Sequence, residues 1–197
     1  MIFLILIPIN LFSLYHFFEI VGQLKTDVRE RESAVSIGII GDVDNAVKNS
    51  FAVIHALSQH PAVMERNSGE CDRLFAALLP RYPLLLNITA SDMDGRNYGS
   101  SGNYKPEEVR SLMYTDKEWF KTARMGNNVV GDLHISNLFK RPTVMLPGPV
   151  LNSAGKQVGI IGTALDLSRL TERLSRWPLS DNSLTIVVDS NGNIACQ

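Results

Sequence analysis

The stretch RPTVMLPGPVLNSAGKQVGIIGTALDLSRL, residues 141–170, contains two apolar segments separated by a short polar one. Apolar runs of the length of Thr143 to Leu151 and Val158 to Leu167, bounded by turn residues, are typical of buried β-strands. Asn152 to Gly155, between them, supplies residues that tight turns prefer. The stretch therefore predicts two adjacent antiparallel strands, followed by a helix from Ser168 to Arg176.

Further strands and two short helices are predicted upstream of this hairpin. LLLNITAS, DMDG and RNYGSS, residues 84–101, indicate a strand, a tight turn and a second strand. Pro106 to Met113 is a predicted helix, and Trp119 to Met125 is another that ends at Gly126. Val129 to Ser136 follows as a strand. The result is an antiparallel sheet with helices inserted between its second and third strands, which is an α+β fold.

The N-terminus has the sequence of a membrane anchor. Its first 18 residues, MIFLILIPINLFSLYHFF, are apolar apart from Asn10, Ser13 and His16. Together with Ile20 and Val21 they approach the roughly 20 residues needed to cross a bilayer. A cleaved signal peptide would need a basic start and a small-residue cleavage site, and the sequence shows neither. We therefore expect residues 1–22 to be an uncleaved anchor, whose orientation the mixed charges that follow leave open.

Residues 23–66 carry apolar side chains at helical spacing, and this segment has no proline before Pro61. The pattern predicts a long helix that leaves the membrane. Gly38 and Gly41 lie inside it, where they indicate either a break or a place where another helix approaches closely. A second helix is predicted from Cys71 to Leu79, with Pro80 ending it.

The composition is that of an ordinary folded protein and argues against several classes. With 197 residues, 45% hydrophobic content and a formal net charge of -1, the chain can bury a core but lacks the basic stripe of a dedicated nucleic-acid binder. Cys71 and Cys196 are too few for a disulfide framework or a zinc knuckle, and we expect them to pack as small apolar residues. The histidines show no metal-ligand spacing, and nucleophile and phosphate motifs are absent. We therefore expect no metal, no cofactor, no nucleic-acid partner and no enzymatic activity.

Two segments of the chain resemble each other. ITASDMDGRNYG at 88–99 and TIVVDSNGNIAC at 185–196 both place a D-x-x-G turn between two strand-like segments. Asp92 corresponds to Asp189, and Gly95 corresponds to Gly192. This correspondence predicts that the fold begins a second time near the C-terminus, although D-x-x-G turns also occur in unrelated hairpins.

The order of these elements resembles the double Cache family of extracytoplasmic sensor domains. The resemblance is carried by the membrane span, the long exit helix, and the segments RYPLLLNITASDMDGRNYGSS, YTDKEWFKTA, VVGDLHIS and RPTVMLPGPVLNSAGKQVGIIGTALDLSRL. It implies two PAS-like α+β units strung along one long helix, residues 23–66. Residues 67–167 would form the membrane-distal, ligand-binding unit. Residues 168–197 would form a linking helix and the incomplete start of the membrane-proximal unit.

The resemblance also implies ligand-binding positions. Relatives that bind amino acids hold the ligand with an Arg-Pro-Trp-Tyr segment, a Tyr-x-Asp segment and an Asp on the last strand. Trp119 and Asp166 match this pattern. Lys117 stands at the position of the arginine, whose forked guanidinium would bind a carboxylate through two hydrogen bonds. Phe120 lacks the phenol of the tyrosine that it replaces. The class of ligand stays open, since Tyr-x-Asp is also replaced, by Asp132 and His134.

The side chains themselves indicate a pocket for a small polar molecule, which needs apolar walls and a few convergent polar groups. Two aromatic residues can supply the walls, two basic residues positive charge, and two acidic residues negative charge. These six are Trp119 and Phe120, Lys117 and Arg141, and Asp132 and Asp166.

Simpler roles compete with ligand binding for each of these residues. Alternation along the predicted strand 129–136 places Asp132, His134 and Ser136 on one face, which requires a ligand or hydrogen-bond partners only if it points into the domain. The two aromatic residues could instead belong to the hydrophobic core. Asp166 could cap the following helix, and the remaining charged groups could be solvated.

We therefore expect the sensor domain of a bacterial transmembrane receptor, anchored in the inner membrane with residues 23–197 in the periplasm. A small extracellular metabolite would bias a two-state arrangement that is relayed to an output module such as a histidine kinase, a diguanylate cyclase or a chemotaxis domain. The exit helix also offers a surface for a homodimer. Two alternatives stay open: an interaction module without a ligand, and an extracytoplasmic hydrolase or transferase that uses Asp132, His134 and Asp166 for acid/base chemistry.

Overall fold

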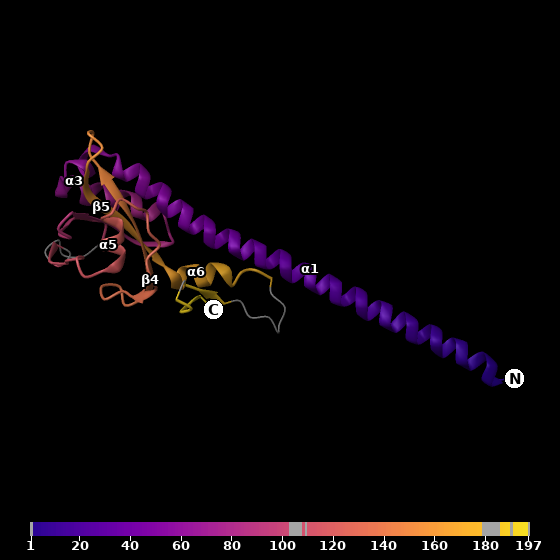
Figure 1. Cartoon of the computed structure of the whole chain (residues 1–197). Coiled ribbons are helices and arrows are strands. Elements are labelled where there is room, and N and C mark those ends of the chain that lie inside the picture. The colour runs from indigo at the N-terminus through magenta and orange to yellow at the C-terminus, as the bar shows by residue number, and fades with distance from the viewer. Residues whose placement is uncertain (1, 103–107, 109, 179–185, 190, 197) are drawn as a thin grey trace. The chain divides into compact units, whose positions relative to one another are not determined.

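The computed structural model describes residues 2–102, 108, 110–178, 186–189 and 191–196. Two compact units are present: residues 1–41 with 177–183, and residues 42–176 with 184–197. The second unit contains the sheets and all the helices after α1, and Figure 1 labels some of them. The α+β class predicted from the sequence is confirmed.

The predicted long helix is confirmed as α1, Ile2–Ser58, although it ends earlier than expected. A separate short helix, α2 (Pro61–Met64), follows it because proline cannot continue a helix but suits the first position of a new one. The ring Nδ1 of His60 caps α2 by accepting the N–H of Ala62 at 3.2 Å. Within the described residues, no helix combines the length and the apolar character needed to cross a membrane.

Gly38 does not break α1, and it marks a close approach. A Cβ atom added there would overlap the ring of Trp177, whereas the same position at Gly41 has no atom within 4 Å. The partner at Gly38 is thus a tryptophan from a segment near the C-terminus rather than another helix.

The second predicted helix is confirmed as α3, Ser68–Leu78, continued by a 3-10 turn, η1, at Leu79–Arg81. Asn67 caps α3 by accepting the N–H of Glu70 at 3.3 Å. Cys71 is buried and its thiol donates to the carbonyl of Ala62 at 3.2 Å. Burial, with a smaller contribution from neighbouring carboxylates, raises the pKa of the Cys71 thiol to about 11, so this cysteine is a neutral core residue at pH 7, as expected.

The predicted hairpin forms the centre of a five-stranded antiparallel sheet with the order β2-β1-β5-β4-β3. Figure 1 shows its two long strands, β4 and β5, side by side. The strands are β1 (Leu85–Asp92), β2 (Asn97–Ser100), β3 (His134–Ile135), β4 (Pro142–Leu151) and β5 (Gln157–Asp166).

The strand predicted at 129–136 is wrong for most of its length, because only His134–Ile135 pairs as a strand. The preceding residues still run beside β4: the N–H groups of Val129 and Gly131 donate to the carbonyls of Pro147 and Met145 at 3.0 and 2.8 Å. A full ladder cannot form here because Pro147 has no N–H to return. Asp132 and His134 are exposed while Ser136 is buried, so the three do not form one inward-facing polar row.

The two faces of the sheet are covered by different helices. On one face, Gly148 approaches Ile54 of α1, and Gly99 approaches Cys71 and Phe75 of α3. On the other face, the core cluster joins Ile160 of β5 to two residues of α5, which spans Glu118–Ala123. We call this second face the α5 face. Paired residues of antiparallel strands project from the same face, so the registers assign to it Asn87, Thr89, Ser91, Thr143, Met145, Pro147, Ile160, Gly162, Ala164 and Asp166.

The predicted helix after the hairpin is confirmed as α6, Leu167–Leu174, and the second hairpin as β6 (Val187–Val188) and β7 (Ile194–Cys196). Its D-x-x-G turn repeats the first one closely. The N–H of Gly95 donates to the carbonyl of Asp92 at 3.1 Å, and the equivalent bond from Gly192 to Asp189 is 3.0 Å. Both glycines have φ near +80°, where other residues are strained.

Some predicted features fall partly outside the described residues. In the helix predicted at Pro106 to Met113, residues 106, 107 and 109 are outside. In the predicted segment 168–197, residues 179–185, 190 and 197 are also outside.

Candidate functional site

A buried polar cluster lies on the α5 face, where β1 and β2 meet the segment before α5. The side-chain amide of Asn97 donates to the hydroxyl of Thr89 and, at 3.4 Å, to the phenol oxygen of Tyr114. The Thr89 and Tyr114 oxygens are 3.5 Å apart. Thr89 and Asn97 are buried, and Tyr114 is half-buried. Three polar groups from three segments therefore converge at one place.

The strand pattern of β1 explains why these polar groups are buried. Asn87, Thr89 and Ser91 alternate with Ile88 and Ala90, so the apolar side chains enter the core beneath α1 and α3 while the polar ones line the α5 face. Their burial requires hydrogen-bond partners. Asn87 Oδ1, for example, accepts from two neighbouring serine hydroxyls at 3.1 and 2.7 Å.

Trp119 lies next to this cluster and is half-buried. Its ring centroid is 5.2 Å from that of Tyr114, at an interplanar angle of 50°. Gly131 allows this packing, because a Cβ there would lie 2.9 Å from the carbonyl oxygen of Met145 and 3.3 Å from Cβ of Trp119. The sequence-predicted Trp119 is thus held over the α5 face between Tyr114 and β4.

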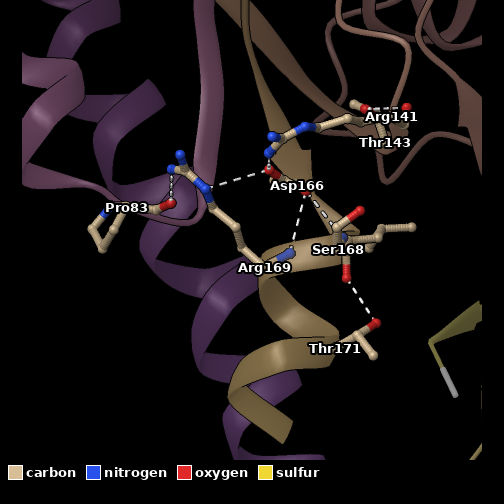
Figure 2. Close-up of polar contacts among 8 residues, drawn as sticks. Pro83, Arg141, Thr143, Asp166, Ser168, Arg169 and Thr171 are labelled. Carbon is tan, nitrogen blue, oxygen red and sulfur yellow. Dashed lines mark hydrogen bonds and ion pairs between the residues drawn. The ribbon is translucent and has the colours of Figure 1, made fainter. Parts of the chain in front are cut away.

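Asp166 lies at the end of β5 on the same face and has no exposed surface. One carboxylate oxygen caps α6 by accepting the N–H groups of Ser168 and Arg169 at 3.0 and 3.3 Å. The other binds the guanidinium of Arg141 at 2.9 Å and lies 3.5 Å from Nε of Arg169. Figure 2 shows the two arginines approaching the carboxylate from different sides.

The electrostatics around Asp166 favour an anion. Two guanidiniums and one carboxylate leave one net positive charge, and the side chains of Arg141 and Arg169 are 49% and 47% exposed. The buried carboxylate fixes both arginines, since a fork held at one edge keeps its other N–H groups in a defined direction. A second carboxylate could approach the exposed parts of these guanidiniums.

Two predicted ligand residues occupy simple structural positions. Phe120 is 1% exposed and packs with Ala123 and Ile160 in the core, and its ring meets Trp119 edge-on at 6.1 Å between centroids. Lys117 is exposed and forms an ion pair of 2.9 Å with Asp116, whose pKa is lowered mainly by that hydrogen bond. Phe120 supports Trp119 from the core side, whereas Lys117 lies at the surface.

Asp132 and His134 are both exposed and do not join Asp166. The Asp132 carboxylate accepts a hydrogen bond from the side chain of Asn191 at 2.9 Å, and the His134 ring lies 3.2 Å from the carbonyl of Asp132. Among the described residues, Asp166 shares no hydrogen bond with either of them. The three groups of the hydrolase alternative are therefore not assembled into one acid/base site.

Sequence reasoning missed Thr89, Asn97 and Tyr114. A detectable pattern existed in β1, since Asn87, Thr89 and Ser91 place polar groups at period two in a strand otherwise made of buried apolar residues. Asn97 and Tyr114 had no comparable local pattern, because only the sheet register and the fold of the inserted segment bring them to Thr89. Among the described residues, no three His, Cys, Asp or Glu side chains are grouped as metal ligands.

The chain is similar to a known family and to several solved structures. A family model described as the Cache domain matches residues 20–197. The Escherichia coli DcuS sensor domain is 22% identical with a TM-score of 0.54, and the match covers 68% of this chain and 98% of that one. The ligand-binding domain of the Campylobacter jejuni chemoreceptor Tlp3, in complex with L-valine, is 14% identical with a TM-score of 0.68, covering 87% and 71%.

A third similar structure is the sensor domain of the Vibrio cholerae histidine kinase DctB. It is 12% identical with a TM-score of 0.64, and the match covers 78% of this chain and 61% of that chain. None of the curated proteins matches the sequence. At these identities, the likeness to solved structures shows a shared fold.

Proposed function

Because the chain belongs to the Cache domain family, we propose that it is the sensor domain of a bacterial receptor and that it binds a small metabolite on the α5 face of its sheet. The observation that carries this proposal is the convergence of Thr89, Asn97 and Tyr114 beside the half-buried Trp119. Polar groups gathered next to an aromatic wall are the usual composition of a small-molecule site.

The arrangement favours a ligand with an anionic group and a compact body. Arg141, directly before β4, offers a guanidinium that pairs with Asp166. Trp119 offers a half-buried aromatic surface beside Tyr114. Free amino acids with apolar side chains combine these features, and the Tlp3 relative was solved with L-valine and with isoleucine. They are the first ligands to test.

The predicted site residues then take different roles in this proposal. Trp119 and Arg141 contact the ligand, Asp166 positions Arg141, and Phe120 supports Trp119 from the core. Contacts from Lys117, Asp132 and His134, which lie on the exposed side of the site, stay predictions.

The same proposal includes membrane attachment. Residues 1–22 would anchor the chain in the inner membrane, with residues 23–197 in the periplasm, and α1 would relay the ligand-dependent change and pair two copies. Support comes from the apolar sequence of this segment and from the exposed apolar side chains farther along α1, among them Leu24, Val28, Ile37 and Ile40.

The test is a thermal-shift screen of the full chain against amino acids, carboxylates, amines and purines. A ligand that binds only the native state stabilises it by RT ln(1 + [L]/Kd), which is about 2.7 kcal/mol at a hundredfold excess over Kd. We expect Trp119→Ala to abolish the shift and Tyr114→Phe to weaken it. Met125→Ala is the control, since Met125 lies two residues after the end of α5 and is exposed.

The screen also separates this proposal from the interaction module. A shift that survives Trp119→Ala would place the ligand elsewhere in the molecule. No shift from any compound, in a chain that unfolds cooperatively and forms dimers, would favour the interaction module.

A further inference from the structure

Three turns of the second unit share one geometry. They begin at Asp92, Asn152 and Asp189, and in each the first residue accepts two backbone N–H groups on its side-chain oxygen. In each, the fourth residue is a glycine with positive φ that donates its N–H to the first carbonyl. The turns differ in what they contact. The middle turn simply joins β4 to β5.

The first turn holds one end of the segment that carries Trp119. The carbonyl of Gly95 accepts the N–H of Tyr114 at 3.2 Å, and Arg96 forms a β-bridge with Met113. A Cβ at Gly95 would lie 3.0 to 3.2 Å from atoms of Thr115 and Tyr114, so the contact is close. Residues 113–133, which we call the site segment, begin at this turn.

The turn that begins at Asp189 holds the other end. Asn191 donates its side-chain N–H to the carboxylate of Asp132 at 2.9 Å. The pKa of Asp189 is lowered, first by a hydrogen bond from the Asn193 side chain and further by backbone N–H groups that include that of Leu133. Two neighbouring residues of the site segment therefore contact two residues of one turn.

Between these two ends, the site segment carries three residues of the proposed ligand site or of its packing. Tyr114 and Trp119 follow the first turn, and Gly131, which packs against Trp119, is one residue from Asp132. Among the described residues, two backbone hydrogen bonds join the last part of the segment to β4, from the N–H groups of Val129 and Gly131. A displacement of this last part of the segment would therefore act on the contact with Asn191.

We propose that the contact of Asp132 and Leu133 with Asn191 and Asp189 couples the ligand site to the second hairpin, β6–β7. This inference rests on the proposed function for the site itself. A ligand that shifts Trp119 and Gly131 would change the free energy of docking of the second hairpin, and by linkage the hairpin would change ligand affinity by the same factor. The second hairpin is thus the receiver of the signal, and Asp132 connects it to the site segment.

Hydrogen exchange of the ligand-free full chain tests this coupling. Asn191→Ala removes the side-chain contact, and the turn should tolerate it because the middle turn has Ala154 at the equivalent position. We expect exchange of the Gly131 amide to accelerate about fivefold or more, the lower range of typical coupling between sites. Asp94→Ala is the matched control, at the equivalent position of the first turn, and should leave Gly131 unchanged.

A second variant tests the opposite direction. Gly131→Ala must displace the segment, because the added Cβ would lie 2.9 Å from the Met145 carbonyl oxygen. The amides of Asp189 and Asn193 should then exchange faster, while the Asn152 amide of the middle turn stays as it was.

Unchanged exchange at Gly131 in Asn191→Ala would overturn the coupling, and so would unchanged exchange at Asp189 in Gly131→Ala. Neither result would affect the proposed ligand site, which the thermal-shift screen tests separately.

Discussion

Two buried threonines, Thr143 and Thr163, have opposite effects on the stability of the fold. Thr143 is 1% exposed and donates its hydroxyl to the carbonyl of Arg141 at 3.0 Å. Thr163 is fully buried on the opposite face, paired with Ile88 and Leu146, and its hydroxyl has no hydrogen-bond partner in the described part of the chain. A buried polar group without a partner costs free energy, whereas a satisfied one contributes modestly to stability.

Valine substitutions at these two threonines should therefore shift stability in opposite directions. Thr163→Val keeps the shape and removes the unpaired hydroxyl, so we expect the free energy of unfolding to rise by about 1 kcal/mol. Thr143→Val removes a satisfied hydrogen bond and should lower it by about 1 kcal/mol. Urea unfolding of both variants measures the difference. A loss of stability in Thr163→Val would indicate a water or another partner at that hydroxyl.

At the scale of elements, α6 begins where it does because of Asp166. The carboxylate caps the first turn of the helix and also holds Arg141 and Arg169. The far end of α6 is tied to α1 within the second unit, where Arg173 pairs with Asp42 at 2.7 Å. Between them, Leu170 and Leu174 are buried. One buried side chain therefore sets both the helix start and the position of the arginine proposed for the ligand.

Two substitutions of Asp166 measure separately what its negative charge and its capping of α6 contribute to stability. Asp166→Asn keeps a good cap but removes the charge that binds the arginines, and should cost about 1.5 to 3 kcal/mol of unfolding free energy. Asp166→Ala also removes the cap and should cost about 1 kcal/mol more. Thermal or urea unfolding provides both values. Equal stability of the two variants would mean that the cap contributes nothing.

The two glycines of α1 offer a matched comparison. Gly41→Ala meets no atom within 4 Å and should stabilise the helix by up to about 1 kcal/mol. Gly38→Ala gains the same helix propensity but must displace the Trp177 ring, which typically costs about 1 to 3 kcal/mol. Circular dichroism gives the stabilities, and tryptophan fluorescence should change only in Gly38→Ala. Stabilisation by both variants would show that Trp177 does not pack there in solution.

At the scale of the whole molecule, the two units differ in how their backbone is protected. The second unit surrounds its sheet with helices on both faces, and Ile88, Leu146 and Ile161 have no exposed surface. In the first unit, every side chain of α1 from residue 22 to residue 34 is exposed. A helix without packed side chains is only marginally stable in water, so the two units should not unfold with the same free energy.

Hydrogen exchange of the full chain should therefore show a steep gradient along α1. Amides of residues 23–34 should exchange faster than those of β5 by roughly two orders of magnitude or more, since local opening costs far less than global unfolding. Strong protection of residues 23–34, matching that of β5, would instead indicate that a second copy of the chain covers this helix. A dilution series would then identify the dimer, because the protection would fall with concentration.

The elements of this protein follow from local sequence. Proline and glycine positions, helical periodicity and turn residues predicted α1, α3, α5, α6, the central hairpin and the repeated D-x-x-G turns, because each of these depends on residues only a few positions apart. The family resemblance had the same origin, in the order of those elements. Helix ends and the strand at 129–136 were less accurate, since the missing N–H of Pro147 acts on a segment almost twenty residues away.

Only the tertiary structure decided which side chains meet. Phe120 and Trp119 are neighbours in sequence, yet one enters the core and the other lies over the sheet. Asp166 meets Arg141 through the pairing of β4 with β5, and Asp132 meets Asn191 across nearly sixty residues. The physical reason is that a side chain's direction depends on the register and face of the element that carries it, and these are set by burial of the whole core rather than by neighbouring residues.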